Sequence, residues 1–317
     1  MVTTIAFMNL KGGVGKTTLA ANIVRAIADV EKLKILLMDL DSQCNLTQIF
    51  SSAEDIDRQG ERSVYQCFES KQFFKQPPSP SDLKISLYSN KLGSQIDIIY
   101  GSFETFQLAV SVPGGLKVNA AVQHFRDFMQ KAQLEYDIIV LDTNPSGTFT
   151  TLCALDVSNF LVAPITFDKF SMRGVHLLTQ VLRGRYPWLG NPRQLRLLPN
   201  RIPRSTDQKL LDRLEKEEQS IREYFPNLSS CIMANRIHES KLLANKQPEL
   251  NFIVDRRVWP IHRAALAKVR EDFEEAAKEV LISTREVMGN AAREHQTTLD
   301  VMRSQFEEKS EWPLVRH

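Results

Sequence analysis

A buried strand, a glycine-rich loop and a helix follow one another near the start of the chain, and this order constrains the fold most. Residues 3–8 (TTIAFM) are a largely apolar run before the glycines, which predicts a buried strand. Residues 17–28 (TTLAANIVRAIA) carry apolar side chains at helical spacing, and residues 34–40 (KILLMDL) predict a second strand. Strand, helix and strand within about 40 residues form a βαβ unit, which predicts a parallel sheet with helices on both faces.

The same alternation continues along the chain. Further strands are predicted at residues 96–100, 136–142 and 160–165, with weaker candidates at 195–198 and 231–233. Further helices are predicted at residues 118–133, 174–182 and 209–224. The expected fold class is therefore α/β, a doubly wound and mostly parallel sheet with helices on both faces.

The pattern also predicts how the chain is divided. Residues 1–285 are expected to form one domain, with a polar insertion at about 50–95 that contains a loop at 75–82 (KQPPSPSD). From residue 260 the apolar spacing predicts one long helix, with a break near residues 289–290. Residues 286–317 are expected to form a C-terminal helical extension.

Composition excludes several classes of protein. The formal net charge of +2 predicts no partner by itself, so a nucleic-acid surface has to be a local patch. Four cysteines, at positions 44, 67, 153 and 231, lack metal-site spacing, which argues against a zinc ribbon or a disulfide framework. The sequence shows neither a signal peptide nor a membrane-spanning apolar stretch, so we expect a cytoplasmic protein.

The glycine-rich loop reads KGGVGKTT at residues 11–18. It departs from the general phosphate-loop pattern because Leu10 stands where the first glycine belongs. Its glycines still permit a tight turn whose N–H groups face a phosphate at a helix N-terminus. The simpler interpretation, a turn that binds nothing, is disfavoured by the strand–loop–helix order. The expected ATP-binding residues here are Gly12, Gly13, Val14, Gly15, Lys16, Thr17 and Thr18.

Three of these side chains have expected roles in binding ATP. Lys16 is expected to meet the β- and γ-phosphates, and the Thr17 hydroxyl is expected to bind Mg²⁺. Thr18 is placed to reach the α-phosphate. The loop contains a second lysine, Lys11, which a phosphate cradle alone does not require.

The string KGGVGKTT resembles the deviant Walker A motif of the ParA/MinD family of ATPases. Residues 36–47 (LLMDLDSQCNLT) resemble the family's switch I segment, and residues 137–146 (DIIVLDTNPS) resemble its Walker B and switch II segment. Residues 158–178 resemble the next strand, loop and helix, and residues 197–202 (LLPNRI) place Asn200 where the family has a base-contacting asparagine. The resemblance covers about residues 1–280 and implies a P-loop NTPase fold. The chain looks most like ParA proteins without an N-terminal DNA-reading domain.

The resemblance implies roles for four charged residues. Lys11 matches the signature lysine, which crosses the interface of an ATP-bound dimer and touches the partner's phosphates. Asp41 would orient the attacking water, Asp39 would support the Mg²⁺ shell, and Asp142 would hold Mg²⁺ through water. The simpler interpretations are a solvated lysine at a loop edge and aspartates that cap helices or face solvent.

Three residues depart from the family pattern. Ser42 and Cys44 stand where the family usually has proline and glycine, and Asn144 stands where the Walker B segment usually has its first proline. Cys44 carries a Cβ where glycine can adopt a positive φ. These changes leave the phosphate ligands in place and bear on the hydrolysis rate and on the response to a partner.

A local excess of positive charge marks the C-terminal third. Residues 183–204 contain six arginines and no acid. ParA proteins bind DNA without sequence preference through basic residues in this region, by contacts to phosphates. The competing interpretation is a solvated face whose arginines pair with acids at 212–218. The expected DNA-binding residues are Arg204, Arg236, Lys241 and Lys246.

Together these features predict an ATPase that dimerises with ATP and Mg²⁺, binds DNA non-specifically and hydrolyses slowly. Such a protein would partition DNA or position a cargo on the nucleoid, with a ParB-like activator as partner. A MinD-like membrane switch, which ends in a basic amphipathic helix, is the main alternative. The tail at 296–317 is mixed in charge and only sparsely apolar, so it lacks the cationic face that anionic lipid would require. An iron–sulfur electron donor would need a suitably placed cysteine pair. A metabolic ligase or kinase on the same fold would generally lack the second lysine.

Overall fold

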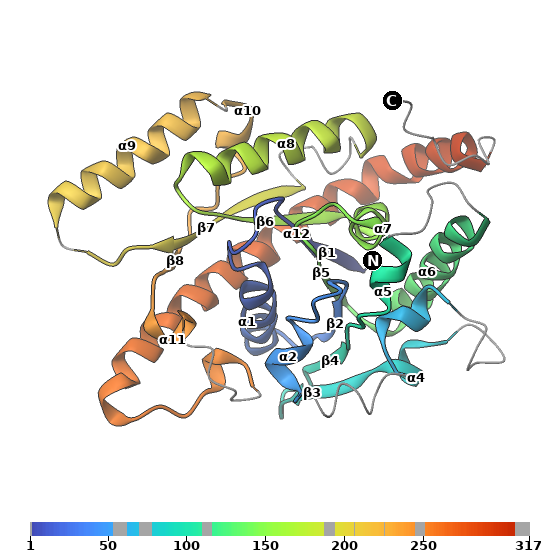
Figure 1. Cartoon of the computed structure of the whole chain (residues 1–317), viewed down its shortest axis with the longest axis horizontal. Coiled ribbons are helices and arrows are strands. Elements are labelled where there is room, and N and C mark those ends of the chain that lie inside the picture. Colours follow the sequence, from blue (N-terminus) through green and yellow to red (C-terminus); the bar gives the residue numbers. More distant parts are fainter. Residues whose placement is uncertain are drawn as a thin grey trace.

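The computed structural model describes residues 2–52, 62–69, 78–109, 116–186, 194–205, 207–224, 226–244 and 251–307. These residues form an eight-stranded sheet of order β3-β4-β2-β5-β1-β6-β7-β8 (Figure 1). Among the described strands, β3 pairs antiparallel with β4, and the other pairs are parallel. The strands are β1 (Thr3–Phe7), β2 (Lys34–Asp39), β3 (Ile85–Ser89), β4 (Gln95–Ile99), β5 (Ile138–Asp142), β6 (Phe160–Ile165), β7 (Leu195–Ile202) and β8 (Ile237–His238).

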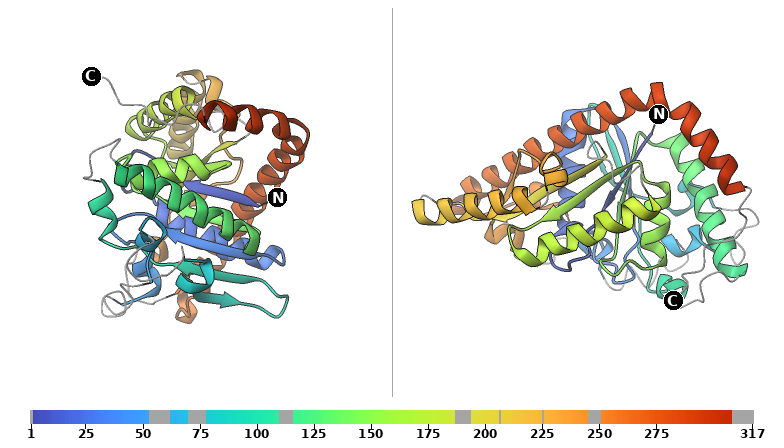
Figure 2. Two further views of the ribbon diagram at one scale, coloured as in Figure 1. Left: turned by 90° about the vertical axis from the view of Figure 1, so that its right-hand side faces the viewer. Right: turned by 90° about the horizontal axis from the view of Figure 1, so that it is seen from above.

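Helices cover both faces of the sheet, which confirms the predicted fold class. One face carries α1 and α12, and the other carries α6, α7 and α8 (Figures 1 and 2). The longer helices are α1 (Lys16–Val30), α6 (Leu116–Glu135), α7 (Phe149–Val157), α8 (Lys169–Arg185), α9 (Gln208–Tyr224) and α12 (Arg263–Glu307). The short ones are α2 (Thr47–Phe50), α4 (Pro80–Leu83), α5 (Thr105–Ala109), α10 (Pro226–Ser229), α11 (Lys241–Ala244) and the 3₁₀ turns η1 (Val64–Cys67), η2 (Ile253–Asp255) and η3 (Pro260–His262).

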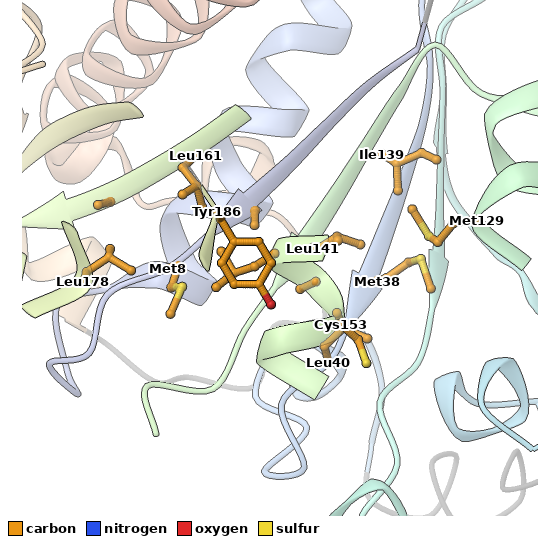
Figure 3. Close-up of a cluster of buried hydrophobic side chains, with 14 of the residues drawn as sticks. Met8, Met38, Leu40, Met129, Ile139, Leu141, Cys153, Leu161, Leu178 and Tyr186 are labelled. Carbon is orange, nitrogen blue, oxygen red and sulfur yellow. The ribbon is translucent and has the colours of Figure 1, made fainter. Parts of the chain in front are cut away.

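The central strands are buried on both faces because their side chains alternate between two apolar layers. Along β2, Ile35 and Leu37 point toward α1 and α12, whereas Leu36 and Met38 point toward α6 and α7. Figure 3 shows the second layer, in which the buried Tyr186 ring lies among methionine and leucine side chains. This continuous apolar burial explains why the strands read as unbroken apolar runs in the sequence.

The polar insertion contributes the edge strand β3, which the sequence pattern did not reveal. Asp97 on the neighbouring β4 is fully buried and holds this edge through three side chains. It accepts hydrogen bonds from Lys84 Nζ at 2.9 Å, from Tyr136 Oη at 2.8 Å and from the Gln95 amide at 2.8 Å. Burial raises the pKa of Tyr136, and the Asp97 carboxylate raises it further.

We expect Asp97→Ala to destabilise the protein by about 2–4 kcal/mol, because buried donors lose their acceptor. Urea unfolding measures this change. Asp156→Ala is the matched control, since Asp156 pairs with Arg126 at the surface, and it should cost less than about 1 kcal/mol. Equal losses in the two variants would contradict a special role for the Asp97 network.

Three local predictions differ from the structure in part or in full. Residues 231–233 form no strand, because Ile232 makes a single bridge to Leu197 and the edge strand is β8 instead. Of the predicted loop at 75–82, residues 75–77 lie outside the described residues, and residues 80–82 belong to α4, which begins with a Ser79 capping box to Asp82. The helix α12 continues through residues 289–290, although Figure 2 shows its C-terminal part, in red, turning in a new direction. Because α12 crosses position 285, a separate 286–317 tail stays a proposal, and residues 308–317 lie outside the described part.

No helix in the described ranges is both long and apolar enough to span a membrane.

Candidate functional site

The phosphate loop connects β1 to α1 and is shaped by glycines. Gly13 and Gly15 have φ values of 74° and 89°, a left-handed conformation that glycine adopts without steric cost. Gly15 is the N-cap of α1, so the N–H groups of the first helical turn remain available to a phosphate. A Cβ at Gly15 would lie only 2.6 Å from Nδ2 of Asn200. The loop therefore has the conformation that an anion site at a helix N-terminus requires.

Two asparagines hold this loop from the sheet. Asn200 on β7 donates from Nδ2 to the Val14 carbonyl at 2.8 Å. Asn9, which the sequence analysis did not single out, is fully buried and donates to the Pro164 carbonyl at 2.7 Å. Its Oδ1 accepts the Lys11 backbone N–H at 2.9 Å. The amide donor of Asn200 is thus engaged by the loop, and its contact to a base stays a prediction.

Lys16 lies at the start of α1 and is almost fully buried, at 7% exposure. Burial lowers the pKa of Lys16 below its ordinary value, while the charges of Asp142 and Asp41 oppose this shift. The structure therefore brings Lys16 together with two of the predicted aspartates. These groups come from three elements that are separate in the sequence.

Asp142 ends β5 and is fully buried. Neither of its carboxylate oxygens has a hydrogen-bond partner among the described residues. Burial raises the pKa of Asp142 well above its ordinary value, and the neighbouring Asp39 acts in the same direction, whereas Thr17 and Lys16 oppose the shift. Thr17 and Lys16 lie near enough to stabilise the charged form, but no hydrogen bond of normal length from the described residues reaches either oxygen, so a cation or a water molecule suits this position.

Asp39 ends β2 beside Asp142, with which it is paired in register. Its Oδ2 accepts hydrogen bonds from the Thr47 backbone N–H at 2.8 Å and from the Thr47 hydroxyl at 2.7 Å. Burial raises the pKa of Asp39 to about 7, and the Thr47 hydrogen bonds oppose the increase. A Cβ at Gly101 would lie 2.9 Å from the Asp39 carboxyl carbon, so only glycine fits there without displacing a neighbour.

The residues present fit a magnesium ion. Two buried carboxyls disfavour ionisation together, and a bound cation would remove that penalty. No group of three or more His, Cys, Asp or Glu side chains within the described residues forms a complete metal cage. Magnesium typically keeps water and phosphate oxygens and takes few protein ligands, so this donor set suits it. Thr17, Asp39 and Asp142 are the residues that would hold it.

Asp41 follows β2 and is buried, at 6% exposure. Its Oδ1 accepts the Gln43 backbone N–H at 2.9 Å and the Asn144 side-chain amide at 2.9 Å. Cys44 adopts a φ of 53°, so the segment keeps the left-handed turn expected of glycine despite the Cβ. Burial raises the pKa of the Cys44 thiol to about 12, so the thiol stays neutral.

A cavity of about 420 Å³ lies beside the phosphate loop. The loop residues 11–14 form one wall, and residues 166–168 and 201–203 form others. Arg201 lines the cavity with a φ of 58°, which is an uncommon conformation for a residue other than glycine.

The second lysine, Lys11, lies on the rim of this cavity. Its Nζ is 2.8 Å from Asp168 Oδ2 and 3.0 Å from Asp168 Oδ1, and both side chains are about one-third exposed. Burial acts to raise the pKa of Asp168, but hydrogen bonds from Lys11 and Thr166 hold it below its ordinary value. Lys11 is thus separate from the buried Lys16, on the outer side of the loop. Asp168 is not among the site residues predicted from the sequence.

The predicted DNA-binding residues do not form one unpaired basic face. Arg204 pairs with Asp272 at 2.6 Å, and Arg236 pairs with Glu218 at 2.6 Å. Lys241 is exposed at the start of α11, whereas Lys246 lies outside the described residues. Each arginine therefore already commits one guanidinium nitrogen to an internal ion pair.

Curated proteins with similar sequences include members of the ParA family. The virulence plasmid ParA family protein pGP5-D of Chlamydia psittaci is 31% identical over 181 residues, which cover 56% of this chain and 62% of the relative. The chain spans less than two thirds of the length of the first curated relatives that it matches.

Solved structures share the fold. A pNOB8 ParA bound to nonspecific DNA has a TM-score of 0.63 and 22% identity, covering 90% of this chain and 99% of that chain. A plasmid partition protein of Borrelia burgdorferi B31 bound to AMPPNP has a TM-score of 0.64 and 19% identity, covering 89% and 99%. A family model described as an AAA domain matches residues 2–185, more than half of the chain. The chain therefore belongs to the AAA-domain family, as a ParA-type member.

Proposed function

We propose that this protein is an ATP-dependent switch that binds ATP and Mg²⁺, dimerises, binds DNA without sequence preference and hydrolyses ATP slowly to ADP and phosphate. Its task would be the partition of DNA or the positioning of another cargo, on the nucleoid in the cytoplasm. A ParB-like activator would stimulate hydrolysis.

One observation carries the nucleotide part of this proposal. Lys16, Asp39, Asp41 and Asp142 come from three separate elements and converge, buried, at the phosphate loop. Phosphoryl transfer to water needs positioning and charge compensation more than covalent chemistry, and these groups supply both. In this proposal Lys16 binds phosphate oxygens, and Asp41 orients the attacking water. Magnesium, when bound, would neutralise charge on the phosphates.

The partly exposed Lys11 supports the dimer in this proposal. A cation outside the pocket can compensate γ-phosphate charge in a facing protomer, as an arginine finger does. The same cation disfavours dimerisation without nucleotide, because two positive loops would then face each other. The Asp168 pair restrains Lys11 on the rim and would be exchanged for the partner's phosphates.

The DNA part of the proposal rests on the basic residues and on fold likeness to a ParA bound to nonspecific DNA. Co-sedimentation of the protein with unrelated DNA fragments in ATP, ADP or no nucleotide tests it. We expect binding with ATP only and equal binding to fragments of different sequence. Binding to anionic vesicles and not to DNA would favour a MinD-like membrane switch instead.

Salt dependence tests which residues contact the DNA. The slope of log affinity against log salt should be near −0.9 for each phosphate neutralised. We expect Arg204→Ala with Lys241→Ala to flatten the slope by about one to two per protomer while ATP binding is kept. Lys91→Ala, which removes an exposed lysine in the turn between β3 and β4, is the control and should leave the slope unchanged. An unchanged slope in the double variant would assign these two side chains to the solvated surface.

A further inference from the structure

The departure at position 144 places an amide against the carboxylate of Asp41. Asn144 Nδ2 donates to Asp41 Oδ1 at 2.9 Å, and the Gln43 backbone N–H donates to the same oxygen at 2.9 Å. None of the described residues donates a hydrogen bond to the other oxygen, Oδ2. The carboxylate is therefore held through one oxygen, while the second is available to a water molecule.

The orientation of the Asn144 amide is determined by its partners. Its Oδ1 accepts the Ser146 backbone N–H at 2.7 Å, and the Ser146 hydroxyl also donates to it. A backbone N–H can only donate and an ionised carboxylate can only accept, so the amide nitrogen must face Asp41. The backbone carbonyl of Asn144 also accepts a hydrogen bond from the Thr151 hydroxyl of α7, at 3.2 Å. Asn144 is therefore anchored by the segment that follows β5 and holds the segment that follows β2.

We propose that Asn144 is a positioning residue, which sets the orientation of the Asp41 carboxylate toward the attacking water. This inference rests on the proposed ATPase function. Proline, the usual residue here in the family that the sequence resembles, has no side-chain donor and cannot make this contact. Misplacement of a catalytic group by about 1 Å can cost a hundredfold in rate, so one hydrogen bond that fixes a carboxylate has a large effect.

The decisive variant is Asn144→Asp, which keeps the shape of the side chain and replaces the donor by an acceptor. We expect kcat for ATP hydrolysis to fall at least about tenfold, because the Asp41 carboxylate loses its donor and is repelled by the added negative charge, whereas KM for ATP should stay within about twofold because the phosphate ligands are unchanged. In an Asp41→Ala background the same change should lower kcat no further. Asn235→Ala is the matched control, since Asn235 donates to Glu279 at 2.8 Å away from the phosphate loop, and its kcat should equal that of the wild type.

A second measurement needs no turnover. Hydrogen exchange of the Gln43 amide in the nucleotide-free protein should be several-fold faster in Asn144→Asp, because the shared acceptor becomes mobile. Circular dichroism checks folding, and Asn144→Ser, which is too short to reach Asp41, replaces the aspartate variant if that variant does not fold.

The outcomes separate the two proposals. A wild-type protein that does not hydrolyse ATP overturns the proposed function, and the role of Asn144 with it. A wild-type protein that does hydrolyse ATP, with an unchanged kcat in Asn144→Asp, overturns the role of Asn144 alone. Equal losses from Asn144→Asp with and without Asp41 would also overturn it, because the residue would then act independently of Asp41.

Discussion

Lys16→Ala is expected to abolish productive ATP binding, with a loss of affinity of at least about a hundredfold. The ammonium group of Lys16 is buried beside the phosphate loop, among carboxyls, and would meet the phosphates from inside the pocket. Charge-assisted contacts to phosphate are about twice as strong as neutral hydrogen bonds, and a hundredfold loss corresponds to about 2.8 kcal/mol. Titration of a fluorescent ATP analogue measures the affinity.

Lys11→Ala is the matched control, because it removes the other lysine of the same loop. Its side chain is directed to Asp168 on the rim and not to the buried carboxyls. We expect nucleotide affinity within about twofold of the wild type, together with loss of the ATP-dependent dimer in light scattering with a non-hydrolysable analogue. A Lys11→Ala protein that dimerises normally would remove the cross-interface role. A Lys16→Ala protein that binds ATP normally would remove the pocket role.

Asp41→Ala is expected to bind ATP and to dimerise, but to lower kcat by at least about a hundredfold, which is typical when a group that assists proton transfer or orients water is lost. The phosphate ligands remain in place, so KM for ATP should change little. The variant should also remain on DNA longer than the wild type, because release follows hydrolysis in the proposed cycle. Single-turnover hydrolysis and dissociation from immobilised DNA measure the two effects.

Asp127→Ala on the exposed side of α6 is a suitable control for the loss of one carboxylate, and its turnover should be unchanged. If Asp41→Ala turns over at the wild-type rate, Asp41 does not orient the water, and Asp39 becomes the candidate. Asp39 has a different environment, because both of its oxygens accept hydrogen bonds, Oδ2 from the Thr47 backbone N–H and hydroxyl and Oδ1 from the Asp41 backbone N–H at 3.2 Å.

Much of the fold could be predicted from the sequence because its signals are local. Buried parallel strands produce continuous apolar runs, and β6 matches the predicted residues 160–165. The edge strands were harder to predict. β3 is less buried than the central strands, although it is as long as β1 and β5, and β8 has only two residues, so both carry little sequence signal. The Ile232 bridge depends on pairing with the distant Leu197 of β7, which local propensity does not specify.

The sequence by itself determined the phosphate loop, because tight turns and a helix start depend on residues that are neighbours in the chain. The tertiary structure alone decided which side chains meet there. Asn144 reaches Asp41 across 103 positions and Asp168 reaches Lys11 across 157, and no local pattern specifies such pairs. The tertiary structure also paired Arg204 with Asp272, 68 positions away, so a basic run in the sequence is not a free basic face. Asn144, Asp41, Asp168 and Lys11 all follow parallel strands, whose carboxyl ends lie at one edge of the sheet whatever their separation in the chain, whereas Asp272 is brought to Arg204 by the packing of α12.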